Sequence, residues 1–203
     1  MQFQTVPSTA DVIDLNPTAG PGLKQVIANA ALFNLVWAAC VVGAAHANPW
    51  LGVVAASAML TVHLRATPNR LSELRLILTT VLIGFTSDSI FAASGLLRYE
   101  AGMMLPWLAP VWILSLWFAF GTTLNLSLRW LKNRWWLGMG LGAVSGPLSY
   151  FSGSRLGAVE FSNTGLALIC LSLTWAILLP VLAALASRSD AANLATDLEH
   201  RDA

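Results

Sequence analysis

Asp88 is the residue whose type and position could do the most chemistry in this sequence. It stands next to Ser87 and Ser89, near the middle of an apolar segment that covers residues 74–97. An ionised aspartate at the centre of a membrane helix costs about 2.5–3.5 kcal/mol on insertion scales. A carboxyl group placed there usually faces the interior of a helix bundle and has a partner or a task.

Arg155 is the best candidate for that partner. Counting about 1.5 Å per helical residue leaves a gap of about 9 Å between Asp88 and Arg155 along the membrane normal. Helical side chains lean toward the N-terminus of their own helix, which for Arg155 is the direction of Asp88. Two interpretations stay open, because the pair could be an internal structural link or a site for a proton or a substrate.

The segment of residues 135–154 carries a regular pattern of small residues. Gly138, Gly142 and Gly146 recur at a spacing of four, so they share one helical face. Small residues at this spacing let a second helix approach closely. The pattern predicts tight packing within the chain or, alternatively, a seam between two copies of the chain.

Pro147 follows Gly146 directly and interrupts the same segment. A proline inside a helix removes one backbone hydrogen bond and can kink the helix. The freed carbonyl groups predict a polar cavity inside the bundle. The candidate intramembrane polar site therefore consists of Asp88, Ser89, Ser149, Tyr150 and Arg155, beside a helix break at Gly146 and Pro147.

The sequence offers no recognisable catalytic or metal-binding constellation. Its three histidines are scattered over different segments, and its two cysteines form no CxxC, haem or zinc spacing. Cys40 and Cys170 have similar predicted depth, so a disulfide is conceivable, but two buried thiols are the plainer interpretation. We predict no catalytic residue, no metal and no cofactor.

The composition favours lipid over water as the surrounding medium. Of 203 residues, 56% are hydrophobic and only 10% are charged, whereas a soluble domain carries about 25% charged residues. Disorder requires low hydrophobicity and a high net charge, which is the opposite composition. A formal net charge of +1 gives no reason to expect a nucleic-acid partner.

Six apolar segments approach the length of about 20 residues that a membrane-spanning helix needs. Their short connections predict antiparallel neighbours in one all-α bundle. The segments are residues 27–45, 49–64, 74–97, 103–126, 135–154 and 165–187. The chain is thus divided into a polar N-terminal tail (1–24), a six-helix transmembrane domain (25–187) and a polar C-terminal tail (188–203).

Lysine and arginine predict the orientation of this bundle. With six spans, nine of the eleven basic residues lie on the side of both termini, and only Arg98 and Arg155 lie on the other. Positive residues that flank spans stay in the cytoplasm, so both termini are predicted to be cytoplasmic. An alternative is that the first apolar segment belongs to a cleaved signal peptide. It would include Lys24, the apolar residues that follow and the small-residue cleavage site Ala45-His46-Ala47, and its removal would leave five helices.

Polar and basic residues gather where the fourth segment passes into the fifth. Thr122, Thr123, Asn125 and Ser127 are expected to hydrogen-bond between helices, which is worth about 0.6 kcal/mol each on average. The alternative to this packing role is a site for lipid head groups, which would be contacted by Arg129, Lys132 and Arg134.

Several short motifs carry a resemblance to a known family. The most specific is Gly146-Pro147-Leu148-Ser149-Tyr150, followed by Gly153, Arg155, Leu156 and Gly157. Two further motifs are Asn48-Pro49-Trp50-Leu51-Gly52 and Ser127-Leu128-Arg129-Trp130-Leu131. In these three motifs the chain resembles a family of bacterial inner-membrane proteins defined as a domain of unknown function. The resemblance extends over about residues 33–185. It implies a multi-pass protein of the bacterial inner membrane, encoded near cyclopropane-fatty-acid-synthase-like genes and linked to lipid modification.

Three functions are weighed on these grounds. The favoured one is a non-enzymatic accessory or binding protein whose partners are membrane lipids, lipid-modifying enzymes or a second copy held through residues 135–154. The second is a small carrier or channel whose pathway uses Asp88, Arg155 and the Gly146-Pro147 break. The third, an enzyme acting on acyl chains, would need clustered histidine, cysteine or carboxylate groups, and Asp88 is the only one of these predicted to lie deep.

Overall fold

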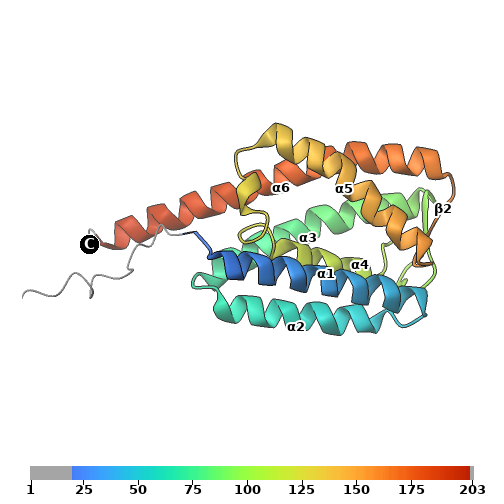
Figure 1. Cartoon of the computed structure of the whole chain (residues 1–203), viewed down its shortest axis with the longest axis horizontal. Helices are drawn as coiled ribbons and strands as arrows, with labels where there is room; N and C mark the ends of the chain where they lie inside the picture. Colours follow the sequence, from blue (N-terminus) through green and yellow to red (C-terminus); the bar gives the residue numbers. More distant parts are fainter. Residues whose placement is uncertain (1–19, 202–203) are drawn as a thin grey trace, which may run out of the picture.

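The computed structural model describes residues 20–201 of the chain, and the predictions for the remaining tail residues lie outside this range. Within it, six α-helices form an elongated bundle, and two short strands pair at the end away from the C-terminus (Figure 1). The elements are α1 (Leu23–Ala45), α2 (Trp50–Ala66), α3 (Arg70–Ala93), β1 (Leu97–Tyr99), α4 (Val111–Gly121), the 3₁₀ helix η1 (Arg129–Leu131), α5 (Trp135–Arg155), β2 (Val159–Phe161) and α6 (Thr164–Arg201). The prediction of an all-α fold with six helices is confirmed for these residues.

The helices are arranged as two outer pairs and one central pair. In Figure 1, α1 and α2 lie together on one side and α5 and α6 on the other, with α3 and α4 between them. β1 and β2 pair antiparallel, with Arg98 opposite Glu160 and Tyr99 opposite Val159. Because β1 follows α3 and β2 follows α5, this pairing joins the central helices to the α5–α6 pair at the end away from the C-terminus.

Several helix ends differ from the predicted segments. α3 begins at Arg70, four residues earlier than predicted, because the Asn69 side chain accepts a hydrogen bond from the backbone N–H of Ser72. It ends at Ala93, ahead of Gly95, which has a positive φ of 70°. α4 is only 11 residues long. It begins after Pro110, and proline favours the start of a helix over its interior.

Three helical stretches are long and apolar enough to cross a membrane: α1, α3 and residues 164–191 of α6. α2 and α4 are apolar but shorter. The outer surface exposes large apolar side chains on these helices, as a surface in contact with lipid would. Examples are Leu35, Val54, Leu82 and Leu173, each more than 60% exposed.

The glycine face of α5 packs directly on α6. Gly138 faces Pro180, where an added Cβ would lie 3.2 Å from the proline Cβ. At Gly142 and Gly146 an added Cβ would overlap the backbone and the indole ring of Trp175. These three glycines therefore pack tightly on α6 within the chain. A seam between two copies on this face is not available, because α6 occupies it.

α5 remains helical through Pro147. The proline lacks the N–H group that would otherwise bind the carbonyl of Ala143, four residues earlier. Ser172 of α6 donates its hydroxyl to that carbonyl at 2.8 Å. The freed carbonyl was predicted to line a cavity, but it is used in helix packing instead.

Candidate functional site

Asp88 lies near the strand end of the bundle and not at the centre of its helix. At about 1.5 Å per residue, it is about 27 Å from the start of α3 at Arg70 and about 8 Å from its end at Ala93. Its side chain is 2% exposed. Asp88 is therefore buried, and it lies closer to a helix end than predicted because α3 ends earlier than the apolar segment.

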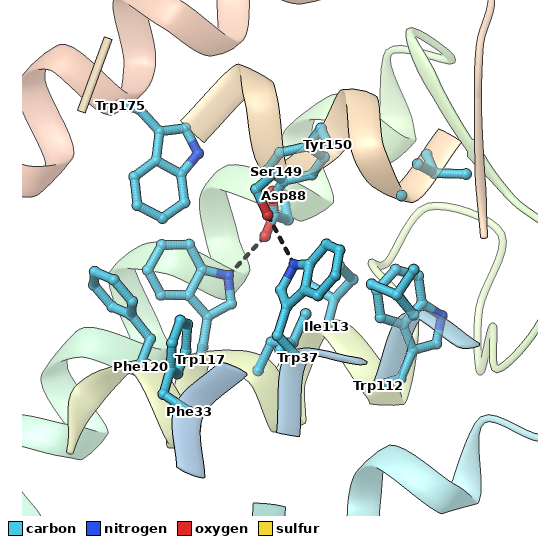
Figure 2. Close-up of a pocket in the computed structure, with 14 residues that line it drawn as sticks. Phe33, Trp37, Asp88, Trp112, Ile113, Trp117, Phe120, Ser149, Tyr150 and Trp175 are labelled. Carbon is cyan, nitrogen blue, oxygen red and sulfur yellow. Dashed lines mark hydrogen bonds between the residues drawn. The ribbon is translucent and has the colours of Figure 1, made fainter. Parts of the chain in front are cut away.

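Two side chains from other helices bind the Asp88 carboxyl group. Tyr150 of α5 donates its hydroxyl to Oδ1. Trp117 of α4 donates its indole N–H to Oδ2 at 2.6 Å, as Figure 2 shows. Hydrogen bonds to an ionised carboxylate are stronger than those between neutral groups. Asp88 therefore joins three helices at one point.

The predicted pair between Asp88 and Arg155 does not form. Arg155 is exposed at the end of α5, and the ion pairs within residues 20–191, whose side chains are described, involve other groups. Helix geometry explains the error: at about 100° per residue, Arg155 is rotated by about 140° from Tyr150 around α5. Because Tyr150 faces Asp88, Arg155 faces away from it.

The two predicted serines have different roles. Ser149 accepts a hydrogen bond from the indole N–H of Trp37 at 2.9 Å, which links α5 to α1 across the site (Figure 2). Ser89 instead accepts from the backbone N–H of Ala109 at 3.1 Å, so it holds the segment that leads into α4. Ser149 belongs to the site and Ser89 supports the fold beside it.

A cavity of about 70 Å³ opens beside Asp88. Seven of its lining residues are aromatic, and none is lysine, arginine or histidine (Figure 2). Those that line it are Phe33, Trp37, Val41, Asp88, Trp112, Ile113, Leu116, Trp117, Phe120, Ser149, Tyr150, Gly153, Val159 and Trp175. We call this cavity the Asp88 pocket.

A stacked pair of indole rings forms one wall of the Asp88 pocket. Trp117 and Trp175 lie 5.3 Å apart between ring centroids, with 13° between their planes. Gly84 of α3 backs the first ring and Gly146 of α5 the second, and an added Cβ at either glycine would overlap the indole. Phe120 packs edge-on against both rings. This wall is fixed from four helices.

Tyr99 of β1 is a further polar group near this site. It is 9% exposed, and its hydroxyl is the buried side-chain polar atom without a hydrogen-bond partner in the described part of the chain. Burial and the nearby charge of Asp88 raise the pKa of Tyr99 well above its usual value. Its ring packs edge-on against Trp112, with centroids 5.7 Å apart.

A second polar cluster lies toward the other end of α3, and sequence analysis missed it. Buried His63 binds Glu73 with 2.8 Å between Nε2 and Oε1, and Asn125 donates to Glu73 Oε2 at 2.6 Å. Lys132 donates to Asn125 at 2.6 Å and to Asp190 at 2.7 Å. We call these five residues the Glu73 network. The predicted segment begins at residue 74, one residue after Glu73, and the N-cap signal of Asn69 could have shown that the helix starts earlier.

The predicted head-group residues separate into two kinds. Lys132 is engaged in the Glu73 network, with a side chain that is only 10% exposed, so it is not free to bind lipid. Arg129 and Arg134 are exposed, and Trp136 beside them is 84% exposed. Basic and aromatic groups together are typical of a membrane interface.

The metal-ligating and thiol side chains of residues 20–191, the range with described side chains, are spread over the fold. No group of three or more histidine, cysteine, aspartate or glutamate side chains is gathered there. Cys40 and Cys170 are both free thiols, so the conceivable disulfide is not formed. Cys40 is buried against Gly52, where an added Cβ would overlap its sulfur atom.

A bundle with three helices long and apolar enough to cross a membrane, and with a buried carboxyl group in an aromatic pocket, is typical of a helical membrane protein with an internal polar site. The chain belongs to the family described as "Protein of unknown function (DUF2878)", which it matches over residues 26–181. The resemblance to a family of unknown function is thereby confirmed. No curated protein and no solved structure matches the chain.

Proposed function

We propose that this protein is a non-enzymatic membrane protein that binds a small molecule in the Asp88 pocket. The observation that carries the proposal is the carboxyl group of Asp88, which Tyr150 and Trp117 hold inside an aromatic cavity. Apolar pockets with a few convergent polar groups are the usual form of a small-molecule site. Ionisable residues inside membrane bundles are costly, and they commonly serve a function.

The proposed setting is the bacterial inner membrane, with six spans and both termini in the cytoplasm. The three helices long enough to cross a membrane, the shorter apolar helices α2 and α4, and the predominance of basic residues on one side support this proposal. The Asp88 pocket would then lie in the half of the bundle farther from the cytoplasm. A carrier is a related possibility that would use Asp88 without Arg155, because Arg155 is exposed.

A second candidate function is support of membrane lipid modification. It rests on the family resemblance and on the exposed Arg129, Arg134 and Trp136 near the start of α5. The test is a comparison of total membrane lipids from a deletion strain, its parent and strains that carry Arg129→Ala or Arg134→Ala. Unchanged lipids in the deletion strain under several stresses would exclude this candidate.

Ligand-dependent stability tests the binding function directly. The full chain in lipid nanodiscs is heated with compounds of several classes, including cations, anions, neutral polar molecules and neutral apolar molecules. A ligand that binds only the folded state raises the melting temperature. We expect at least one class to stabilise the wild type but not Asp88→Asn. Glu160→Gln, which changes an exposed carboxyl group outside the pocket, should keep the effect. If no compound acts through Asp88, the proposed function is wrong.

A further inference from the structure

The charges around the Asp88 pocket are unbalanced. A buried carboxylate is costly in a medium of low dielectric constant unless an opposite charge accompanies it. Its partners, Tyr150 and Trp117, donate hydrogen bonds but carry no positive charge. The nearby Tyr99 is also an acid and could add only negative charge. With no basic residue in the lining, the charge that balances an ionised Asp88 would come from outside the chain, as a bound cation or as a proton.

The walls of the pocket favour a positive guest. Indole and phenyl rings carry negative charge on their faces and attract a cation within about 6 Å of the ring centroid. Trp37, Trp112 and Phe33 line the pocket together with the stacked indole wall. The same faces repel an anion. The carboxylate and the rings therefore select the same sign of charge.

The size and the donor set of the pocket narrow the class of cation. At about 70 Å³, the pocket is roughly half the volume of a cavity of about 150 Å³ that holds benzene. Hard metal ions such as Ca²⁺ take about six to eight oxygen ligands, whereas only Asp88, Ser149 and Tyr150 offer side-chain oxygens here. Each carboxylate oxygen can accept two hydrogen bonds, so Asp88 keeps lone pairs for N–H donors.

We propose that the Asp88 pocket binds a small organic cation, a primary alkylammonium group, with Asp88 as its counter-ion. This proposal rests on the proposed binding function and names its ligand class. The ammonium group can belong to a free amine or to the ethanolamine head group of a lipid. Asp88 lies about 8 Å from the end of α3, which leaves both sources within reach.

Binding of ethylammonium is the direct test. The full chain is placed in nanodiscs of phosphatidylglycerol, and ethylammonium chloride is titrated while tryptophan fluorescence and heat are recorded. Ethanol and sodium acetate serve as neutral and anionic probes of similar size. We expect ethylammonium to bind saturably, and we expect neither ethanol nor acetate to bind. Asp88→Asn should weaken ethylammonium binding by about tenfold or more, which corresponds to about 1.4 kcal/mol or more, and Glu160→Gln should leave it unchanged.

A second variant keeps the test valid if Asp88→Asn fails to fold. Trp37→Leu removes an aromatic wall and leaves the carboxyl group, so it should weaken ethylammonium binding by about threefold to tenfold.

A lipid competition identifies the source of the ammonium group. Part of the phosphatidylglycerol is replaced by phosphatidylethanolamine. If phosphatidylethanolamine competes with ethylammonium, the natural ligand is the lipid head group. If it does not compete, the natural ligand is a free amine. Either result supports the ammonium site.

Three outcomes separate the two proposals. If ethanol or acetate binds through Asp88 and ethylammonium does not, the ammonium site is wrong but the binding function stands. If the Asp88-dependent fluorescence changes only with pH, at any ethylammonium concentration, the pocket takes a proton and the ammonium site is wrong. If no compound of the wider panel acts through Asp88, the binding function itself is overturned.

Discussion

The indole N–H of Trp117 reaches the Oδ2 atom of Asp88 over 2.6 Å, from α4 to α3. The Trp117 ring cannot easily turn away, because it lies between Gly84 and the ring of Trp175. The packing of four helices therefore fixes one hydrogen-bond donor on the carboxyl group. A site organised in this way loses little entropy when it binds a ligand.

Trp117→Phe tests the donor. The variant keeps an aromatic ring in the stack but leaves Asp88 Oδ2 without its partner, and an unsatisfied buried acceptor costs about 1–3 kcal/mol. We expect a lower melting temperature of the purified protein. Trp136→Phe, at an exposed position, is the control and should melt like the wild type. Equal melting temperatures for both variants would mean that the hydrogen bond contributes nothing.

Two glycines of α5 test the wall behind the pocket. An alanine at Gly146 would overlap the indole of Trp175, and overpacking of this kind costs about 1–3 kcal/mol. Gly140 has open space around it, so Gly140→Ala should stabilise the helix by up to about 1 kcal/mol. Thermal unfolding of the two variants should therefore shift in opposite directions. Shifts of the same sign would contradict the observed packing of α5 on α6.

Tyr150 and Arg155 test which side chain of α5 serves Asp88. Tyr150→Phe removes a buried donor and should lower the melting temperature, whereas Arg155→Ala changes an exposed side chain and should leave it unchanged. Circular dichroism during heating measures both. If Arg155→Ala instead lowers the melting temperature of the wild type but not that of Asp88→Asn, Arg155 does pair with Asp88.

Much of this architecture could be predicted from the sequence. The lengths of the apolar segments predict six helices. The spacing of Gly138, Gly142 and Gly146 predicts close packing of α5 against another helix, which is α6. Asp88 stood out because an acid in an apolar run is costly wherever that run lies. Its partners could not be predicted, because helical rotation decides between Tyr150 and Arg155, and one misplaced helix end alters the estimated depth.

The Glu73 network shows the same limit more sharply. Its members come from α2, α3, the segment after α4 and α6, with Glu73 buried in the first turn of α3. Local sequence gives no information about contacts between residues so far apart in the chain. Glu73 lies next to the predicted start of its helix, where local sequence does not indicate burial, yet the chain buries it and pairs it with His63.

Ser172 and Pro147 allow a prediction about the predicted helix break. Ser172→Ala removes the donor to the Ala143 carbonyl, and hydrogen bonds between membrane helices are worth about 0.6 kcal/mol on average. Pro147→Ala restores a backbone N–H at the position that normally binds this carbonyl. The cost of Ser172→Ala should therefore be smaller in the Pro147→Ala background, which a double-mutant cycle on unfolding free energies measures. If the two effects simply add, Ser172 does not compensate for the proline, and the Ala143 carbonyl is satisfied in another way.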